Sequence, residues 1–348
     1  MGSSLEIWVA GFPSSYGGAD TELDHLVDLL RGREVEVHLV PMFGADEAMK
    51  TSVLSRGCAI HEYRPDVFRS RTVISFCNGN FLERLQEIIE RGRPAQVVWF
   101  NCMTQAFEAE RRAHRNGWID RFGFVSAYQE RLLRPVLEQL RPVPILRYRA
   151  YFNPARVTFR YREWAGEYRV GRISRDDGAK FAPDTWRIFD RVLVPPSLRK
   201  KTYVLGYGPN AAARIGPAPP SLDWRTWAGN EIPATQFFRT VDTMIHKTGG
   251  SRESYCRVLI EAYAHGVVPI VERDYAFPEL VVDGETGFMC ADSDEMSYRA
   301  SWLAFHPEAH RRMAEAGRRH LEGVLMDEEA CWVVWGELLG VRPMARAG

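Results

Sequence analysis

The chain has 348 residues, which is long for a domain with a single hydrophobic core and suits two domains. Its 45 Lys and Arg residues balance its 45 Asp and Glu residues, so the overall charge attracts neither nucleic acid nor an anionic membrane. No apolar run reaches the ~20 residues of a membrane span, and the first residues lack the features of a signal peptide. The six cysteines show no CxxC spacing, which argues against a zinc or disulfide framework. We therefore expect a reduced, cytoplasmic protein, with peripheral attachment to a membrane left open.

Strands and helices alternate in the first half, as in a parallel sheet that is covered on both faces. Apolar runs predict five strands, at 5–10, 35–40, 72–76, 97–100 and 122–125. Helical patterns lie between them, at 22–30, 81–91 and 105–116. A further helix is expected to begin after Ser126, because Ser126 and Gln129 match a capping box.

Gly17 and Gly18 follow the first strand and precede its helix. Such a pair lets backbone N–H groups approach an anion at the positive end of the helix dipole. The GxGxxG spacing of dinucleotide sites is missing here. Two interpretations remain, an anion-binding loop and a plain strand-to-helix connection.

The pattern breaks at 141–144 (RPVP), and the stretch 148–166 is typical of a connection between domains. A second series of strands is expected at 168–173, 191–194, 202–205, 244–246 and 267–271, followed by a long helical tail at 307–339. We predict an α/β fold of two Rossmann-like domains that face each other across a cleft. The predicted boundaries are 1–150, 151–325, and 326–348 for a C-terminal helix and tail that can pack back on the N-terminal domain.

The second half opens with a strand that ends near Arg172, followed by Arg175 and Lys180. An Arg and a Lys at one strand end can converge on a single anion, the first as a planar fork and the second as a point charge. In chemistry with a phosphoryl leaving group, they would neutralise the charge that builds up. The alternative is a pair of solvated surface cations.

Residues 206–211 (GYGPNA) match GxGxxA, with Gly208 as the second glycine. The match is weak, because no strand with an acidic end follows about 20 residues later. We interpret it as a glycine-rich loop that lines the cleft. His114, His310 and His320 lie in charged helical stretches, where we expect solvated side chains.

Glu253 and Glu261 lie on either side of seven residues, at the front of a predicted helix. If Ser254 caps that helix, Glu253 lies just outside it and Glu261 about two turns inside. A rise of ~1.5 Å per residue then separates the carboxylates by about 12 Å. This distance fits two ends of an extended ligand, such as a nucleoside-diphosphate sugar. The alternative is an exposed helix with two solvated glutamates.

In this order, and along most of the chain, these motifs resemble the GT-B glycosyltransferases, specifically the retaining family 4. Gly17 and Gly18 look like that family's first glycine-rich loop. Gly171-Arg172 with Arg175 and Lys180 looks like its diphosphate-binding motif. Residues 253–261, 266–271 and 278–288 look like its C-terminal signature.

The resemblance implies roles for individual residues. The catalytic candidates are Arg175 and Lys180, which would hold the diphosphate, and Glu253, which would lie by the transferred sugar. Glu261 would accept hydrogen bonds from the ribose hydroxyls. The other candidates for donor binding are Gly17, Gly18, Arg172, Ser254, Tyr255, Cys256 and Gly208.

One departure concerns the acceptor side. Many family members carry a histidine after the strand that corresponds to 97–100, where this chain has Asn101, Cys102 and Met103. We expect neither a cofactor nor an essential metal, because cationic side chains replace the divalent ion in GT-B chemistry.

The resemblance implies a hexosyltransferase that uses a UDP- or GDP-sugar and retains the anomeric configuration. Two alternatives are an epimerase or hydrolase of nucleotide sugars on the same fold, and a non-catalytic subunit that binds a sugar nucleotide. The acceptor stays open between a small molecule, a glycan, a lipid and a modified nucleic acid. The oligomeric state is not predicted.

Overall fold

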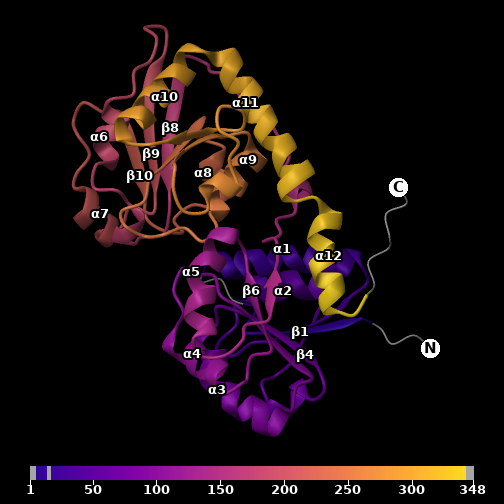
Figure 1. Cartoon of the computed structure of the whole chain (residues 1–348). Coiled ribbons are helices and arrows are strands. Elements are labelled where there is room, and N and C mark those ends of the chain that lie inside the picture. The colour runs from indigo at the N-terminus through magenta and orange to yellow at the C-terminus, as the bar shows by residue number, and fades with distance from the viewer. Residues whose placement is uncertain (1–4, 14–16, 342–348) are drawn as a thin grey trace. The chain divides into compact units, whose positions relative to one another are not determined.

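The computed structural model describes residues 5–13 and 17–341. It divides into two compact units, each with one parallel sheet (Figure 1). The N-terminal unit comprises Met1–Asn153 and Met326–Gly348, and the C-terminal unit comprises Pro154–Leu325. The predicted α/β fold with two Rossmann-like sheets is confirmed.

Seven parallel strands form the N-terminal sheet, in the order β3-β2-β1-β4-β5-β6-β7. They are β1 (Glu6–Ala10), β2 (Glu36–Val40), β3 (Ala59–Ile60), β4 (Thr72–Phe76), β5 (Gln96–Phe100), β6 (Arg121–Phe124) and β7 (Ile145–Arg147). The five predicted strands are present. The two short outermost strands, β3 and β7, were not predicted, because two or three residues carry no readable period.

Helices cover both faces of this sheet. They are α1 (Gly18–Gly32), α2 (Glu47–Ser55), α3 (Gly79–Glu87), α4 (Glu108–Arg115), α5 (Ala127–Glu138) and α12 (Glu328–Leu338). Side chains of α3, α4 and α5 share a core with Trp8, Val73 and Trp99 on one face. On the other face, Phe100 stacks against Trp335 of α12, with ring centroids 5.4 Å apart.

The predicted cap of α5 is present in part. Ser126 Oγ accepts a hydrogen bond from the Gln129 N–H at 3.0 Å. The Gln129 side chain accepts from the N–H of Val125 instead of Ser126. The helix therefore starts where the sequence indicated, and Gln129 is directed toward the end of β6.

Six parallel strands form the C-terminal sheet, in the order β10-β9-β8-β11-β12-β13. They are β8 (Glu167–Ile173), β9 (Arg199–Leu205), β10 (Trp224–Trp227), β11 (Thr243–His246), β12 (Val268–Glu272) and β13 (Phe288–Cys290). The strand order turns back between β8 and β11, which pair directly. In Rossmann-like sheets, such a switch point at the carboxyl ends of the strands is where ligands bind.

The strand predicted at 191–194 is wrong. The backbone groups of this segment bond to side chains, which replaces a strand ladder. The Val192 carbonyl accepts from Lys200 Nζ at 2.8 Å, and the Leu193 N–H donates to Ser301 Oγ at 2.8 Å. The short outer strands β10 and β13 were not predicted.

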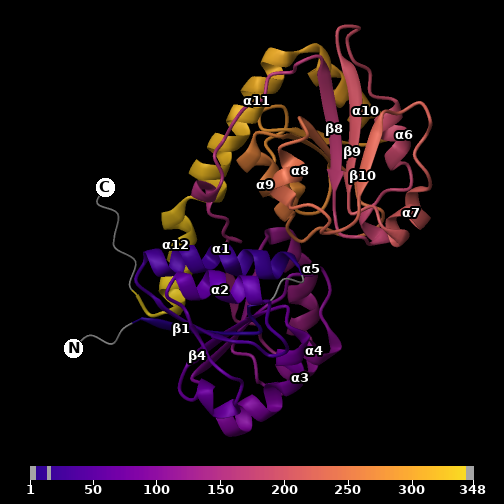
Figure 2. The same ribbon diagram turned by 180° about the vertical axis from the view of Figure 1, so that it is seen from behind.

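Six helices accompany this sheet, with α6, α7 and α10 on one face and α8 and α9 on the other (Figures 1 and 2). They are α6 (Thr185–Asp190), α7 (Pro209–Ile215), α8 (Ala234–Phe238), α9 (Arg257–His265), α10 (Ser293–Phe305) and α11 (Pro307–His320). The tail predicted as one helix at 307–339 is in fact α11, a π-helical turn and α12. Asp327 caps α12 by accepting from the Ala330 N–H at 2.7 Å, so a new helix begins there.

Candidate functional site

Four of the charged and polar side chains of the C-terminal unit meet at the switch point between β8 and β11. Arg172 is the penultimate residue of β8, and Lys180 lies in the loop that follows. His246 is the last residue of β11, and Glu253 lies in the loop between β11 and α9. The structure thus brings together Arg172, Lys180 and Glu253 from the predicted set, and it adds His246.

Lys180 and Glu253 form an ion pair, with 2.8 Å between Lys180 Nζ and Glu253 Oε1. Glu253 is 8% exposed, and burial by itself raises the pKa of a carboxyl group. The neighbouring His246 and the Lys180 ammonium outweigh burial and lower the pKa of Glu253 to about 2. Glu253 is therefore an ionised carboxylate in a nearly dry position.

His246 is neutral at physiological pH. Burial, together with the Arg172 cation, lowers the pKa of His246 to about 4. Arg172 donates to His246 Nδ1 at 2.6 Å, which leaves the ring proton on Nε2. His246 Nε2 lies 3.7 Å from Glu253 Oε1, so the N–H faces the carboxylate.

Arg172 is fully buried, and its guanidinium group is used within the protein. It donates to the carbonyl groups of Ile173 and Lys180, besides His246. Burial lowers its pKa to about 10, so it stays a cation at pH 7. Arg172 thereby fixes the backbone of Lys180, whereas Arg175 is exposed on the same loop.

The loops after β8 and β11 are bonded to each other. The Ala179 carbonyl accepts from the N–H groups of Gly249 and Ser251, at 2.9 and 3.0 Å. A Cβ on Gly249 would lie 2.0 Å from the Phe181 carbonyl oxygen, so only glycine allows this approach. These contacts set the distance between Lys180 and the loop that carries Glu253.

Ser254 does not cap α9, which corrects the prediction. The helix begins at Arg257, and its N-cap residue is Cys256. The helical rise therefore does not set the separation of Glu253 and Glu261, because the chain is helical only from residue 257. Ser254 and Cys256 are buried in this loop, Tyr255 is half-buried, and burial raises the pKa of the Cys256 thiol.

Glu261 lies in α9, one turn after Arg257. Burial raises its pKa, and the positive charge of Arg257 opposes that shift. A partly buried carboxyl group of this kind can accept two hydroxyl hydrogen bonds. The structure places Glu261 near the start of the helix that Glu253 precedes.

Gly208 precedes α7, in the loop with the GxGxxA pattern. The Asp176 carboxylate occupies the start of this helix, where its Oδ1 accepts from the Ala211 N–H at 2.8 Å. A Cβ on Gly208 would lie 2.4 Å from Asp176 Oδ2. The glycine makes room for an internal carboxylate at this helix start.

Gly17 and Gly18 lie at the start of α1, where Gly17 is the N-cap residue. Residues 14–16 of the predicted glycine-rich loop lie outside the described residues. The Gly17 carbonyl accepts from the Thr21 N–H at 3.2 Å, as at an ordinary helix start.

Asn101 follows β5, at the place where the resemblance implies a histidine. It is fully buried, and its side chain donates to Glu110 Oε2 at 2.8 Å and accepts from the Met103 N–H at 2.6 Å. Gln129 donates to the carbonyl groups of Asn101 and Met103. Burial outweighs the hydrogen bonds from Phe107 and Asn101 and raises the pKa of Glu110 to about 7.

Two histidines that were expected to be solvated are buried. His114 is 1% exposed, with Nε2 3.1 Å from the Arg141 carbonyl. His310 is 1% exposed, lies between Tyr161 and Thr243, and has a pKa that burial lowers to about 4. Both lie on the buried face of a charged helix, which a count of charges does not reveal.

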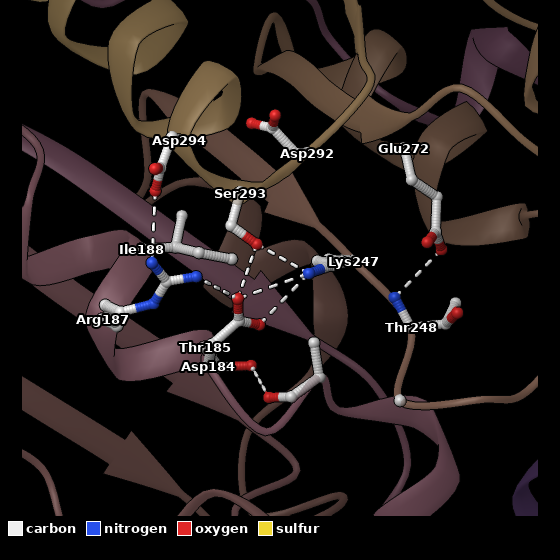
Figure 3. Close-up of polar contacts among 12 residues, drawn as sticks. Asp184, Thr185, Arg187, Ile188, Lys247, Thr248, Glu272, Asp292, Ser293 and Asp294 are labelled. Carbon is white, nitrogen blue, oxygen red and sulfur yellow. Dashed lines mark hydrogen bonds and ion pairs between the residues drawn. The ribbon is translucent and has the colours of Figure 1, made fainter.

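Sequence reasoning missed His246 as part of the site. The available signal was its position as the last residue of an apolar strand that was itself predicted. In a parallel sheet, such a residue lies at the edge where ligands collect. The same argument applies to Glu272, which ends β12 and accepts from the Thr248 N–H at 3.0 Å (Figure 3).

No helix in the described part of the chain is long and apolar enough to cross a membrane. Within residues 5–13 and 17–341, no three His, Cys, Asp or Glu side chains gather in an arrangement that would hold a metal ion.

Residues 231–320 match the family described as glycosyl transferases group 1. This segment contains Glu253, Glu261 and the whole of α9. No curated protein matches the sequence significantly.

Several solved structures share the fold. A TarM variant from S. aureus, solved with Fondaparinux, alpha-GlcNAc-glycerol and UDP, has a TM-score of 0.73 and 8% identity, covering 97% of this chain and 100% of that one. Anabaena HepE with UDP-glucose has a TM-score of 0.66 and 14% identity, covering 96% and 99%. Sucrose-phosphate synthase from Thermosynechococcus elongatus has a TM-score of 0.69 and 13% identity, covering 96% and 98%. The chain thus has the fold of the GT-B glycosyltransferases and, over residues 231–320, matches the glycosyl transferases group 1 family, as the sequence predicted.

Proposed function

We propose that the protein transfers a hexosyl unit from a nucleoside-diphosphate sugar to an acceptor hydroxyl, with retention of the anomeric configuration and without an essential metal. The observation that carries this proposal is the Lys180–Glu253 ion pair at the switch point of the C-terminal sheet. It combines a cation for a departing diphosphate with a carboxylate for the sugar. The family match of residues 231–320 and the UDP and UDP-glucose in the complexes of TarM and HepE favour a UDP-sugar over a GDP-sugar.

In this proposal the C-terminal unit binds the donor. Lys180, with the exposed Arg175, neutralises the charge that develops on the diphosphate as its bond to the anomeric carbon breaks. The ionised Glu253 accepts hydrogen bonds from the sugar and stabilises the positive charge of the oxocarbenium-like state. The backbone of Ser254, Tyr255 and Cys256 contacts the sugar hydroxyls or the phosphates. Glu261 accepts hydrogen bonds from the ribose hydroxyls.

The N-terminal unit binds the acceptor. Its hydroxyl oxygen forms the new bond on the face that the diphosphate leaves, and its proton passes to the leaving phosphate oxygen. The cationic side chains replace a divalent ion, so turnover should persist in EDTA. We also propose a cytoplasmic location, because no disulfide joins the cysteines of the described residues.

A thermal-shift panel of UDP, GDP, ADP and their sugars tests donor binding, because a bound ligand raises the melting temperature by mass action. We expect UDP and a UDP-sugar to stabilise the full chain. Transfer is then measured with the stabilising donor and a set of hydroxyl acceptors. Release of free sugar or a changed sugar without any acceptor would support the hydrolase or epimerase instead, and binding without any turnover would support the non-catalytic subunit.

Lys180→Ala should reduce transfer by about 100-fold or more, because one preorganised charge at a developing anion is worth that much. The matched control is Arg191→Ala, which removes an exposed cation that pairs with Asp294 elsewhere in the same unit. We expect the control to keep wild-type turnover. Wild-type turnover in Lys180→Ala would refute the proposed role of Lys180.

A further inference from the structure

Three consecutive residues at the end of β11 are each held by a different partner. His246 is bonded by Arg172, and the Thr248 N–H donates to Glu272 Oε1. Lys247, between them, extends its side chain toward α6 and α10. The site described above uses His246 but leaves Lys247 without a role.

Lys247 belongs to a closed cluster of three side chains, Asp184, Lys247 and Ser293, which we name the Lys247 cluster (Figure 3). Lys247 Nζ lies 2.6 Å from Ser293 Oγ and 3.3 Å from both carboxylate oxygens of Asp184. Ser293 Oγ in turn lies 2.6 Å from Asp184 Oδ2. Each member contacts the other two, so the three hold one another in place.

The cluster joins three elements that lie far apart in the sequence. Asp184 immediately precedes α6, Lys247 follows β11, and Ser293 is the first residue of α10. Arg187 adds a 2.7 Å ion pair to Asp184 from the solvent side. Burial favours the neutral acid, but Ser293, Arg187 and Lys247 together lower the pKa of Asp184, so it is an anion.

Asp184 lies only four residues after Lys180. Between them, Phe181 and Ala182 are buried, and the Ala182 carbonyl accepts from Thr185 Oγ1 at 2.6 Å. On its other side, the Lys180 backbone is held by Arg172. Arg172 and Lys247 also line one small cavity, together with Thr185 and Ile188 of α6. The segment that carries Lys180 is thus fixed at both ends to β8 and β11.

We propose that Asp184, Lys247 and Ser293 are positioning residues, which act through the Lys180 segment to keep Lys180 Nζ on Glu253. This inference rests on the proposed function for its effect on turnover, but not for its effect on geometry. The cluster touches neither Lys180 Nζ nor Glu253, so it acts by placement alone. A misplacement of about 1 Å at such a site can lower a rate by about 100-fold.

The first test measures geometry and needs no substrate. In a crystal structure of Asp184→Asn, we expect the distance between Lys180 Nζ and Glu253 Oε1 to exceed ~4 Å, the limit of an ion pair. The control Asp294→Asn removes a carboxylate that pairs with Arg187 and Arg191 and makes no contact with Lys247. An unchanged 2.8 Å pair in Asp184→Asn would overturn the proposal, whatever the protein's activity proves to be.

The second test measures turnover with a UDP-sugar. Asp184→Asn, Lys247→Met and Ser293→Ala should lower kcat alike, by about 10- to 100-fold, and should change the Kd for UDP to a similar extent as one another. Asp184→Glu should restore part of the rate. In Lys180→Arg, Asp184→Asn should have a much smaller effect, because Asp184 acts through residue 180.

Two outcomes would overturn the proposal in that test. Additive effects of the residue 180 and residue 184 changes would mean that the cluster only stabilises the fold. A large loss of UDP affinity in Lys247→Met, with none in Asp184→Asn, would mean that Lys247 contacts the donor directly. If wild-type protein binds no nucleotide and transfers no sugar, the proposed function fails while the geometric test still decides the positioning role.

Discussion

The two sheets follow the same strand order over six strands. The side chains at their carboxyl edges differ in chemistry. At the C-terminal sheet, Lys180 and Glu253 form an ionised pair that is largely shielded from solvent. At the N-terminal sheet, Asn101, Glu110 and Gln129 are fully buried, and their polar groups serve the backbone of residues 101–107 and 125. One edge carries an ion pair, whereas the polar side chains of the other shape a loop.

If the proposed function holds, this difference shows how one fold, used twice, can serve two tasks. Holding a diphosphate requires fixed charges, and fixed charges need partners that keep them ionised while partly desolvated. Under the proposed function the acceptor hydroxyl is neutral, so the N-terminal unit could dispense with ionised groups and would need only a loop of defined shape. The two glutamates, Glu253 and Glu110, express this contrast, because their pKa values are shifted in opposite directions.

Replacing each glutamate by glutamine gives the largest predicted difference. Glu253→Gln removes a charge, so we expect kcat for sugar transfer to fall by about 100- to 1,000-fold. Glu110→Gln keeps a hydrogen-bond acceptor for Asn101 and Phe107, so we expect turnover within about threefold of wild type. Steady-state kinetics with a UDP-sugar measure both variants. Equal losses in the two variants would abolish the contrast between the edges.

Two buried groups, Glu110 of the N-terminal unit and His310 of the C-terminal unit, should respond to pH in opposite directions. The pKa of Glu110 is raised from 4.5 to about 7, so between these values the native state holds a proton that the unfolded chain has lost. Its contribution to stability is therefore lost as pH rises through this window. The pKa of His310 is lowered from 6.5 to about 4, so there the unfolded chain binds the extra proton, and stability is lost as pH falls.

Each effect amounts to about 3 kcal/mol in full, at 1.36 kcal/mol per pKa unit. Denaturant unfolding between pH 4 and 8 measures it. Relative to wild type, Glu110→Gln should gain free energy of unfolding as pH rises from 5 to 7.5. The free energy of unfolding of His310→Gln should be below that of wild type at pH 6.5, and this difference should shrink as pH falls to 4. A pH-independent difference for either variant would contradict the assigned proton.

The smallest predicted effect concerns exposed arginines. Arg175→Ala should raise KM for the donor by about tenfold, the value of one exposed charge-assisted contact to a phosphate, and leave the melting temperature unchanged. The matched control is Arg131→Ala, an exposed arginine on α5 of the N-terminal unit. Its KM for the donor should stay at the wild-type value. A shift in the control alone would place donor binding in the other unit.

Much of the fold was readable from the sequence, because buried parallel strands are continuous apolar runs. The strands 72–76 and 97–100 were predicted within one residue of β4 and β5. The segment 191–194 is also an apolar run, but it is a loop, since the side chains of Lys200 and Ser301 bond to its backbone. Contacts of that kind depend on tertiary packing and leave no local pattern.

The site was predictable where charge and strand ends coincide. Lys180 and Glu253 were proposed separately from motifs, and the structure brings them into one ion pair. The sequence could not predict that Arg172 bonds within the protein, because it does not tell whether an arginine side chain is buried or exposed. The burial of His310 was missed because it depends on which face of its helix turns inward. The start of α9 at Arg257 was missed because no side chain caps that helix end.

The chain leaves the N-terminal unit after Asn153 and returns to it at Met326. A ribosome therefore completes the whole C-terminal unit, which is one uninterrupted stretch, before it makes the helix that covers Phe76 and Phe100. Until Trp335 of α12 emerges, those two rings on the N-terminal sheet lack the indole that stacks against them. The order of synthesis thus makes the first unit to begin folding the last to finish.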